Sequence, residues 1–209
     1  MKKASLLFLT IVLSVCAVLL TSCNKGADLY SLGLQMTVQM EELIKSDTYS
    51  KFCNGDFYES QRRAFIANDY DTPTKVYQIT APDAQTILSK MSDYNEDEWN
   101  GLSDSIKEQL LNKVTIQTIV NQINIQNGMD IIWVTNAYVA TKQFNNRSLK
   151  NDVSYLYIFE TGKPIIVTFA PYNGGIKATA QFIVIEQANS LSALREVFEP
   201  FECIVTAIK

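Results

Sequence analysis

Residues 153–186, "VSYLYIFETGKPIIVTFAPYNGGIKATAQFIVIE", decide the fold, because three runs rich in β-branched and aromatic residues follow one another with only short turn signals between them. Thr161-Gly162 separates the first run from the second, and Asn173-Gly174 separates the second from the third. Both dipeptides are typical of two-residue hairpin turns. The stretch therefore predicts an antiparallel meander, and "DIIWVTNAYVATKQF" (130–144) precedes it as a fourth strand.

The turns also predict which residues share a face of this sheet. A turn at 161 and 162 sets Ile158 opposite Ile165, and a turn at 173 and 174 sets Val167 opposite Ala180. The expected core face then consists of Leu156, Ile158, Ile165, Val167, Phe169, Ala178, Ala180, Phe182 and Val184. The opposite face carries Tyr155, Tyr157, Phe159, Ile166, Thr168, Thr179 and Gln181. A bulge at Gly175 would exchange the two rows of the last strand.

The first half of the chain is mainly helical in pattern. "LYSLGLQMTVQMEELIK" (29–45) spaces its apolar residues as an amphipathic helix does. A weaker helical pattern covers 48–67. A further helix is expected from a Thr80 cap to about 91, and another from Ser103 onward, with a break near 113–115. Asn127-Gly128 is either the end of that last helix, which we favour, or a hairpin turn.

A short helix near 192–198 and a possible strand "ECIVTAI" (202–208) complete the chain. We predict a single α+β domain over 28–209, with N-terminal helices packed on one face of a curved antiparallel sheet built around a four-stranded meander (about 130–187). Helices followed by a curved meander resemble the nuclear-transport-factor-like folds and, more loosely, the cystatin-like α+β folds. The resemblance implies the topology alone.

The N-terminus has the three regions of an export signal. Lys2 and Lys3 precede an apolar run over 6–20, and the small residues Thr21 and Ser22 follow it. A helix that spans a bilayer needs about 20 apolar residues, and this run is shorter. We therefore expect residues 1–22 to be a signal peptide.

Leu20-Thr21-Ser22-Cys23 resembles the lipobox of bacterial lipoprotein precursors. The resemblance implies that Cys23 is acylated, that the chain is cut before it, and that residues 23–27 form a short lipidated tether on the extracytoplasmic face of the cell envelope. The lipid bilayer would then be a partner through the acyl chains, because two or three chains give firm anchoring. The alternative is an ordinary secreted protein with an incidental cysteine at the cleavage site.

The charge of the chain excludes one class of partner. The whole sequence has 18 basic and 22 acidic residues. Loss of Lys2 and Lys3 leaves a mature net charge of about −6. A nucleic-acid-binding domain needs a basic face, so we expect no nucleic-acid partner.

Two cysteines, Cys53 and Cys203, remain in the mature chain beyond the lipidated one. In an exported protein a leftover pair favours a disulfide, and closing so long a loop contributes about 4 to 5 kcal/mol in the chain-entropy model. The alternative is two small core residues that stay reduced.

The motifs of common catalytic classes are absent from the sequence. The chain has no histidine, which excludes Ser-His-Asp and Cys-His catalysis, and no phosphate-binding or dinucleotide-binding loop occurs. We expect no cofactor. Asp93, Asn95 and Asp97 alternate as oxygen ligands of Ca²⁺ do, but Glu98 stands where a calcium loop requires glycine. A solvated acidic linker, with Asn100 or Ser103 capping the next helix, is the simpler interpretation.

The remaining candidate site is the tyrosine face, formed by Tyr155, Tyr157, Thr168, Thr179 and Gln181. Aromatic bodies with polar handles suit stacking on a sugar ring or anchoring a partner. The competing interpretations are a solvent-facing sheet or a second face buried under a helix. We therefore expect a non-enzymatic domain that binds an envelope partner or small ligand. The alternatives are an envelope hydrolase that uses paired carboxylates and a structural spacer.

Overall fold

The computed structural model describes residues 28–45, 72–128, 134–140, 149, 152–160, 164–185 and 190–208. The predicted signal peptide, lipid tether, 48–67 helix and Cys53 lie outside these residues. The described strands are β1 (Pro73–Thr80), β2 (Val134–Ala140), β3 (Val153–Phe159), β4 (Ile165–Tyr172), β5 (Gly175–Phe182) and β6 (Ile204–Ala207). The described helices are α2 (Leu29–Lys45), α5 (Ala84–Ser89), α6 (Glu96–Asn100), α7 (Asp104–Leu111), α8 (Ile116–Gln126) and α9 (Leu191–Phe198), with a 3-10 turn η2 (Glu199–Phe201).

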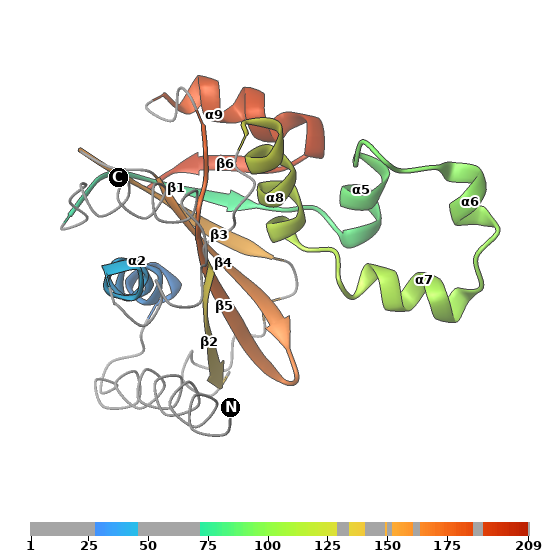
Figure 1. The fold of residues 1–209 in the computed structure, drawn as a ribbon, viewed down its shortest axis with the longest axis horizontal. Coiled ribbons are helices and arrows are strands. Elements are labelled where there is room, and N and C mark those ends of the chain that lie inside the picture. Colours follow the sequence, from blue (N-terminus) through green and yellow to red (C-terminus); the bar gives the residue numbers. More distant parts are fainter. Residues whose placement is uncertain are drawn as a thin grey trace.

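The described strands form one curved, open antiparallel sheet in the order β2-β5-β4-β3-β1-β6 (Figure 1). The predicted α+β class is confirmed. The strands β3, β4 and β5 are a meander, whereas β2 lies beside β5 and not beside β3, its neighbour in sequence. The sequence pattern also missed β1, which is inserted between β3 and β6.

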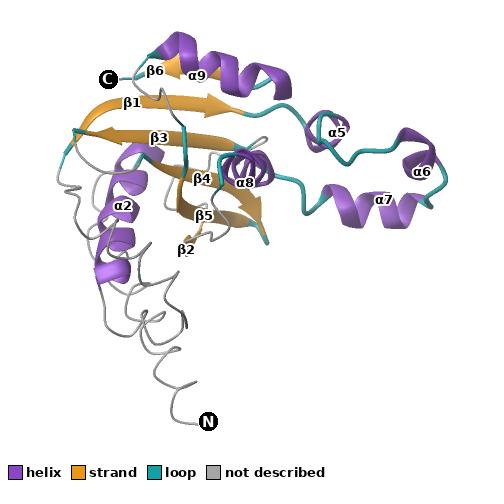
Figure 2. Cartoon of the chain, turned by 45° about the horizontal axis from the view of Figure 1, so that its top comes forward, coloured by secondary structure: helices purple, strands orange, loops and turns teal. Residues whose placement is uncertain are grey.

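Helices cover both faces of the sheet, so the domain has three layers (Figures 1 and 2). The N-terminal helix α2 packs on one face, where Leu32, Met36 and Met40 meet apolar residues of β2 to β5. Helices α8 and α9 pack on the other face, through Ile119 and Phe198 among others. Both rows of the central strands are therefore buried. Helices α5, α6 and α7 form an arm that projects from this body in both views.

The register between β3 and β4 differs from the prediction by one residue. Tyr157 pairs with Ile165, whereas a two-residue turn at 161 and 162 would pair it with Ile166. The register between β4 and β5 is as predicted, with Val167 opposite Ala180. The predicted face assignment is therefore wrong for β3 alone: its tyrosine row lies on the α2 face with Ile165, and Leu156 and Ile158 lie on the α8 face.

The Asn173-Gly174 turn is confirmed. Both residues have positive φ, 44° and 74°, as a type I′ turn requires. The predicted helix break is confirmed as well: α7 ends at Leu111 and Thr115 caps α8, because its hydroxyl accepts the amide of Gln117.

Asn127 is the C-cap of α8, so the predicted helix end is confirmed over the hairpin alternative. The predicted cap of α5 is wrong, since Thr80 belongs to β1 and Asp83 accepts the amide of Thr86 at 3.0 Å. Asp83 is the better cap because it lies directly before the first helical residue.

Candidate functional site

The predicted tyrosine face does not form. Tyr155 and Tyr157 lie under α2, and Tyr157 is fully buried, with its hydroxyl donating to the Tyr30 carbonyl at 2.7 Å. Burial raises the pKa of both phenols, and that of Tyr157 most. The ring of Tyr30 meets both rings, at centroid distances of 6.1 and 6.0 Å. These tyrosines anchor α2 to the sheet.

The other three predicted ligands lie on the opposite face, because the β3 register places the tyrosine row on the α2 side. Thr168, Thr179 and Gln181 are buried. Thr168 accepts from Ser154 at 3.0 Å, Thr179 donates to Asn136 at 2.8 Å, and Gln181 donates to Asn121 of α8 at 3.3 Å. They form a polar row inside the domain. The five predicted residues do not share one accessible surface, and we do not retain them as a site.

The acidic stretch before α7 has a structural use. Asn95 is the N-cap of α6, where its side-chain oxygen accepts the amides of Asp97 and Glu98 at 3.0 and 3.3 Å. Asp93 and Asp97 lie in the same segment of the projecting arm. Among the described residues no group of three or more His, Cys, Asp or Glu side chains is placed to hold a metal ion.

Cys203 lies half-buried between η2 and β6, next to the cluster under α9. Burial raises the pKa of its thiol to about 12, so the side chain is an unreactive thiol at neutral pH. Its partner in the predicted disulfide, Cys53, lies outside the described residues. The pairing therefore stays a prediction.

One half-buried carboxyl group stands out among the described acids. Asp152 precedes β3 and accepts the amide of Ile116, the first residue of α8, at 2.9 Å. Burial raises the pKa of this carboxyl, and the hydrogen bond from Ile116 opposes the rise. Asp152 joins a strand to a helix start and lines neither of the pockets described next.

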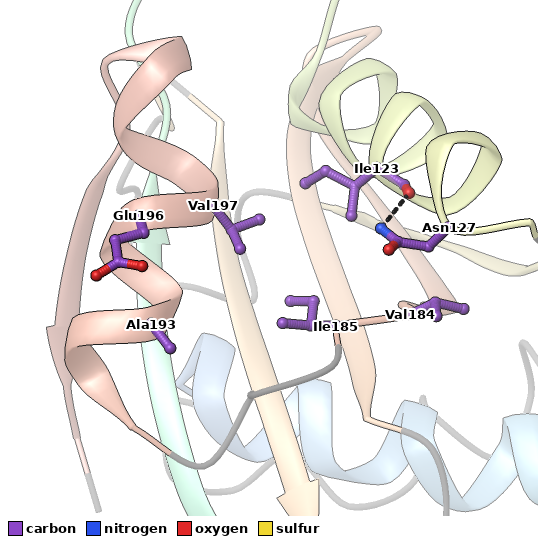
Figure 3. Close-up of a pocket in the computed structure, with 7 residues that line it drawn as sticks. All are labelled: Ile123, Asn127, Val184, Ile185, Ala193, Glu196 and Val197. Carbon is purple, nitrogen blue, oxygen red and sulfur yellow. Dashed lines mark hydrogen bonds between the residues drawn. The ribbon is translucent and has the colours of Figure 1, made fainter.

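A groove of about 330 Å³ opens between α8 and α9 (Figure 3). Ile123 contributes from α8 and Val197 from α9, while the segment after β5 supplies Val184 and Ile185 as the floor. Ile123 is buried, and the other three are half-buried. The groove therefore offers apolar surface that the domain does not cover itself.

Two polar side chains lie at the rim of this groove. Asn127 donates its amide nitrogen to the Ile123 carbonyl at 2.8 Å, which leaves its amide oxygen as an acceptor (Figure 3). Glu196 supplies a carboxylate on α9. The groove thus combines an apolar floor with one acceptor and one negative charge, the pattern of a small binding site.

A second hollow, of about 390 Å³, lies at the tip of the β4–β5 hairpin. Tyr138 of β2 and Tyr172 of β4 line it, with exposed fractions of 56% and 46%. Their ring centroids are 5.2 Å apart, with planes tilted by 46°. This is an accessible aromatic pair, unlike the buried tyrosines under α2.

Sequence reasoning missed both of these surfaces. Tyr138 of β2 and Tyr172 of β4 are 34 positions apart in the sequence, and they meet because β2 lies beside β5. The groove takes its walls from α8, the end of β5 and α9, so no local motif marks it. Comparison of the chain with family models, curated proteins and solved structures found no match.

Proposed function

We propose that this chain is a lipid-anchored extracytoplasmic binding protein whose α8–α9 groove takes a small ligand with an apolar body and one hydrogen-bond donor. The Leu20-Thr21-Ser22-Cys23 lipobox supports the anchor and the location. The ligand class follows from the groove, which is independent of the anchor.

The observation that carries the binding role is the apolar floor of the groove. Ile185 and Val197 are half-buried and lie at the space between the helices (Figure 3). Each square ångström of apolar surface removed from water contributes about 25 cal/mol. The volume is at the low end of the range for small-ligand pockets, about 300 to 1,000 Å³. An apolar ligand of modest size fits these dimensions.

A polar group at the rim would orient a ligand bound in the groove. The amide oxygen of Asn127 is free to accept a hydrogen bond from a ligand, whereas the carboxylate of Glu196 lies on the side of α9 away from Asn127 (Figure 3). A ligand with a hydroxyl or amine head and an apolar body would satisfy both parts.

No observation favours the hydrolase alternative. Glycosidase-type chemistry needs two carboxyl groups about 5 to 10 Å apart. Neither the α8–α9 groove nor the hollow at the tip of the β4–β5 hairpin is lined by two carboxylates of the described residues. The carboxyl with a raised pKa, Asp152, is engaged by a helix amide instead.

The test is a titration with the neutral apolar fluorophore N-phenyl-1-naphthylamine. The mature domain should bind it saturably. Ile185→Trp fills the floor of the groove and should weaken binding by about tenfold or more, which corresponds to about 1.4 kcal/mol. The matched control is Ile204→Trp, because Ile204 is 67% exposed on β6, away from the groove.

Two outcomes would contradict the proposal: no saturable binding by the wild-type domain, or equal affinities for wild type and Ile185→Trp. The far-ultraviolet circular dichroism and melting temperature of each variant must match wild type, so that lost binding reports the groove and not unfolding. Val197→Trp, on the opposite wall, serves as a second variant if Ile185→Trp does not fold.

A further inference from the structure

The hollow at the hairpin tip has a composition that differs from the groove. It lies at the end of the sheet that α8 does not cover, where the β4–β5 hairpin extends past the helices (Figure 1). Tyr138 and Tyr172 are the two aromatic residues among the exposed large hydrophobic side chains of the described chain. Exposed aromatic pairs that remain in water are costly to solvate, so they mark contact surfaces more often than isolated apolar residues do.

The backbone explains why these two rings meet. Tyr138 is opposite Lys177 in the β2–β5 pairing, and Tyr172 is opposite Gly175 in the β4–β5 pairing. The two tyrosines are therefore diagonal neighbours across β5, on one face. Gly175 has no side chain to separate them. A Cβ at this position would lie 2.7 Å from the Val139 carbonyl oxygen, so the close approach of β2 also requires glycine.

A cation flanks the aromatic pair. Lys177 lies on the same face, between Tyr138 of β2 and Ala170 of β4. It forms no ion pair with any carboxylate of the described residues. In a chain whose net charge is −4, a lysine beside two exposed rings that forms no ion pair within the described part of the chain is a local positive site.

We infer that this Tyr138–Tyr172–Lys177 surface binds the pyranose ring of an acidic sugar, such as a uronate unit of an envelope glycan. The carbon–hydrogen face of a sugar packs on an aromatic ring, and the tyrosine hydroxyls exchange hydrogen bonds with sugar hydroxyls. Lys177 supplies the cation for the sugar carboxylate. This surface shares no residue with the α8–α9 groove, so either site can fail a test without the other.

The experiment is isothermal titration of the mature domain with three probes of similar size: tri-galacturonic acid, maltotriose and tri-glutamate. We expect tri-galacturonic acid to bind at least tenfold more tightly than either of the others. Tyr138→Ala with Tyr172→Ala should abolish this binding. Lys177→Gln should reduce the affinity for tri-galacturonic acid to that for maltotriose, because it removes the charge and keeps the platform.

The matched control is Ile208→Ala, since Ile208 has a similar exposed fraction, 47%, on another part of the surface. Equal binding of tri-glutamate would overturn the inference in favour of an acidic peptide site, and equal binding of maltotriose would remove the role of Lys177. No binding of any probe would also overturn it. Tyr138→Phe with Tyr172→Phe keeps the rings and is the second variant, expected to retain stacking but to lose affinity several-fold, if the alanine pair does not fold.

Discussion

Single polar side chains join the layers of this domain at defined points. Asn124 of α8 is fully buried, and its side chain donates to the Phe182 carbonyl and accepts the Val184 amide, both at 2.8 Å. It satisfies the last carbonyl of β5 and an amide two residues beyond the strand, groups whose burial without partners would cost about 1 to 3 kcal/mol each. Hydrogen bonds therefore determine the position of Asn124. The apolar pattern of α8 does not predict them.

Asp152 acts in the same way at the opposite end of α8. Its carboxylate accepts the Ile116 amide and its carbonyl accepts the Ala81 amide, at 2.9 and 3.2 Å. The residue therefore links the end of β1, the start of β3 and the start of α8. A negative charge near a helix N-terminus is favourable, but burial opposes ionisation more strongly, and the pKa is raised above 3.8.

This raised pKa predicts a pH dependence of stability. The stabilising contribution of the Asp152 carboxyl is fully present below pH 3.8 and is lost as the pH rises through its folded pKa. Asp152→Asn keeps an acceptor for the Ile116 amide and carries no charge. We therefore expect the stability of Asp152→Asn relative to wild type to increase as the pH rises from about 3.5 to 7, measured by urea unfolding at several pH values.

Asp83→Asn is the matched control, because the pKa of Asp83 is lowered by hydrogen bonds from Thr86. Its contribution is present above pH 3.8 and lost as the pH falls, so the trend should have the opposite sign. Parallel pH profiles for Asp152→Asn and wild type would contradict the assignment.

At the scale of strands and helices, turn chemistry decided what could be predicted. Asn173-Gly174 has the two positive φ angles of a type I′ turn, and the register it sets between β4 and β5 is correct. The break between α7 and α8 could be predicted because the apolar stripe shifts there, and the structure adds that Thr115 caps α8. Local signals of this kind do not depend on distant parts of the chain.

The register of β3 could not be obtained in this way. Both rows of this strand are apolar, Tyr155 and Tyr157 on one side and Leu156 and Ile158 on the other, because helices cover both faces. Period-two alternation therefore does not say which row meets which helix. The predicted site failed for this reason, and β1 was missed because its apolar and polar residues show no strong alternation.

The close packing of β2 on β5 gives a test at this scale. Gly175→Ala places a Cβ 2.7 Å from the Val139 carbonyl oxygen, so the backbone of one strand must move. We expect a loss of about 1 to 3 kcal/mol in the free energy of unfolding. Gly101→Ala is the matched control, because the nearest atom to its added Cβ is 3.5 Å away and its φ of −73° suits alanine. Equal stabilities of the two variants would contradict the close approach.

The whole molecule is a three-layer body with an arm. Helices α6 and α7 bury no side chain, and the arm leaves the body between β1 and α8 (Figure 2). The described residues contain no helix long and apolar enough to cross a bilayer. The net negative charge of the chain gives no attraction to an anionic lipid surface.

In our proposal the lipobox supplies the membrane anchor, and the sulfur of Cys23 is the atom to which the lipid is attached. Cys23→Ser should abolish incorporation of labelled palmitate and move the protein from the detergent phase to the aqueous phase of Triton X-114, or leave the precursor uncut, because each buried CH₂ contributes about 0.8 kcal/mol to membrane binding. Cys203→Ser is the matched control and should keep the label, since that thiol is half-buried in the folded domain. Unchanged partition of a Cys23→Ser chain that has been cut before residue 23 would show that acylation at this sulfur does not anchor the protein, whereas a loss of partition that Cys203→Ser does not share locates the anchor at residue 23.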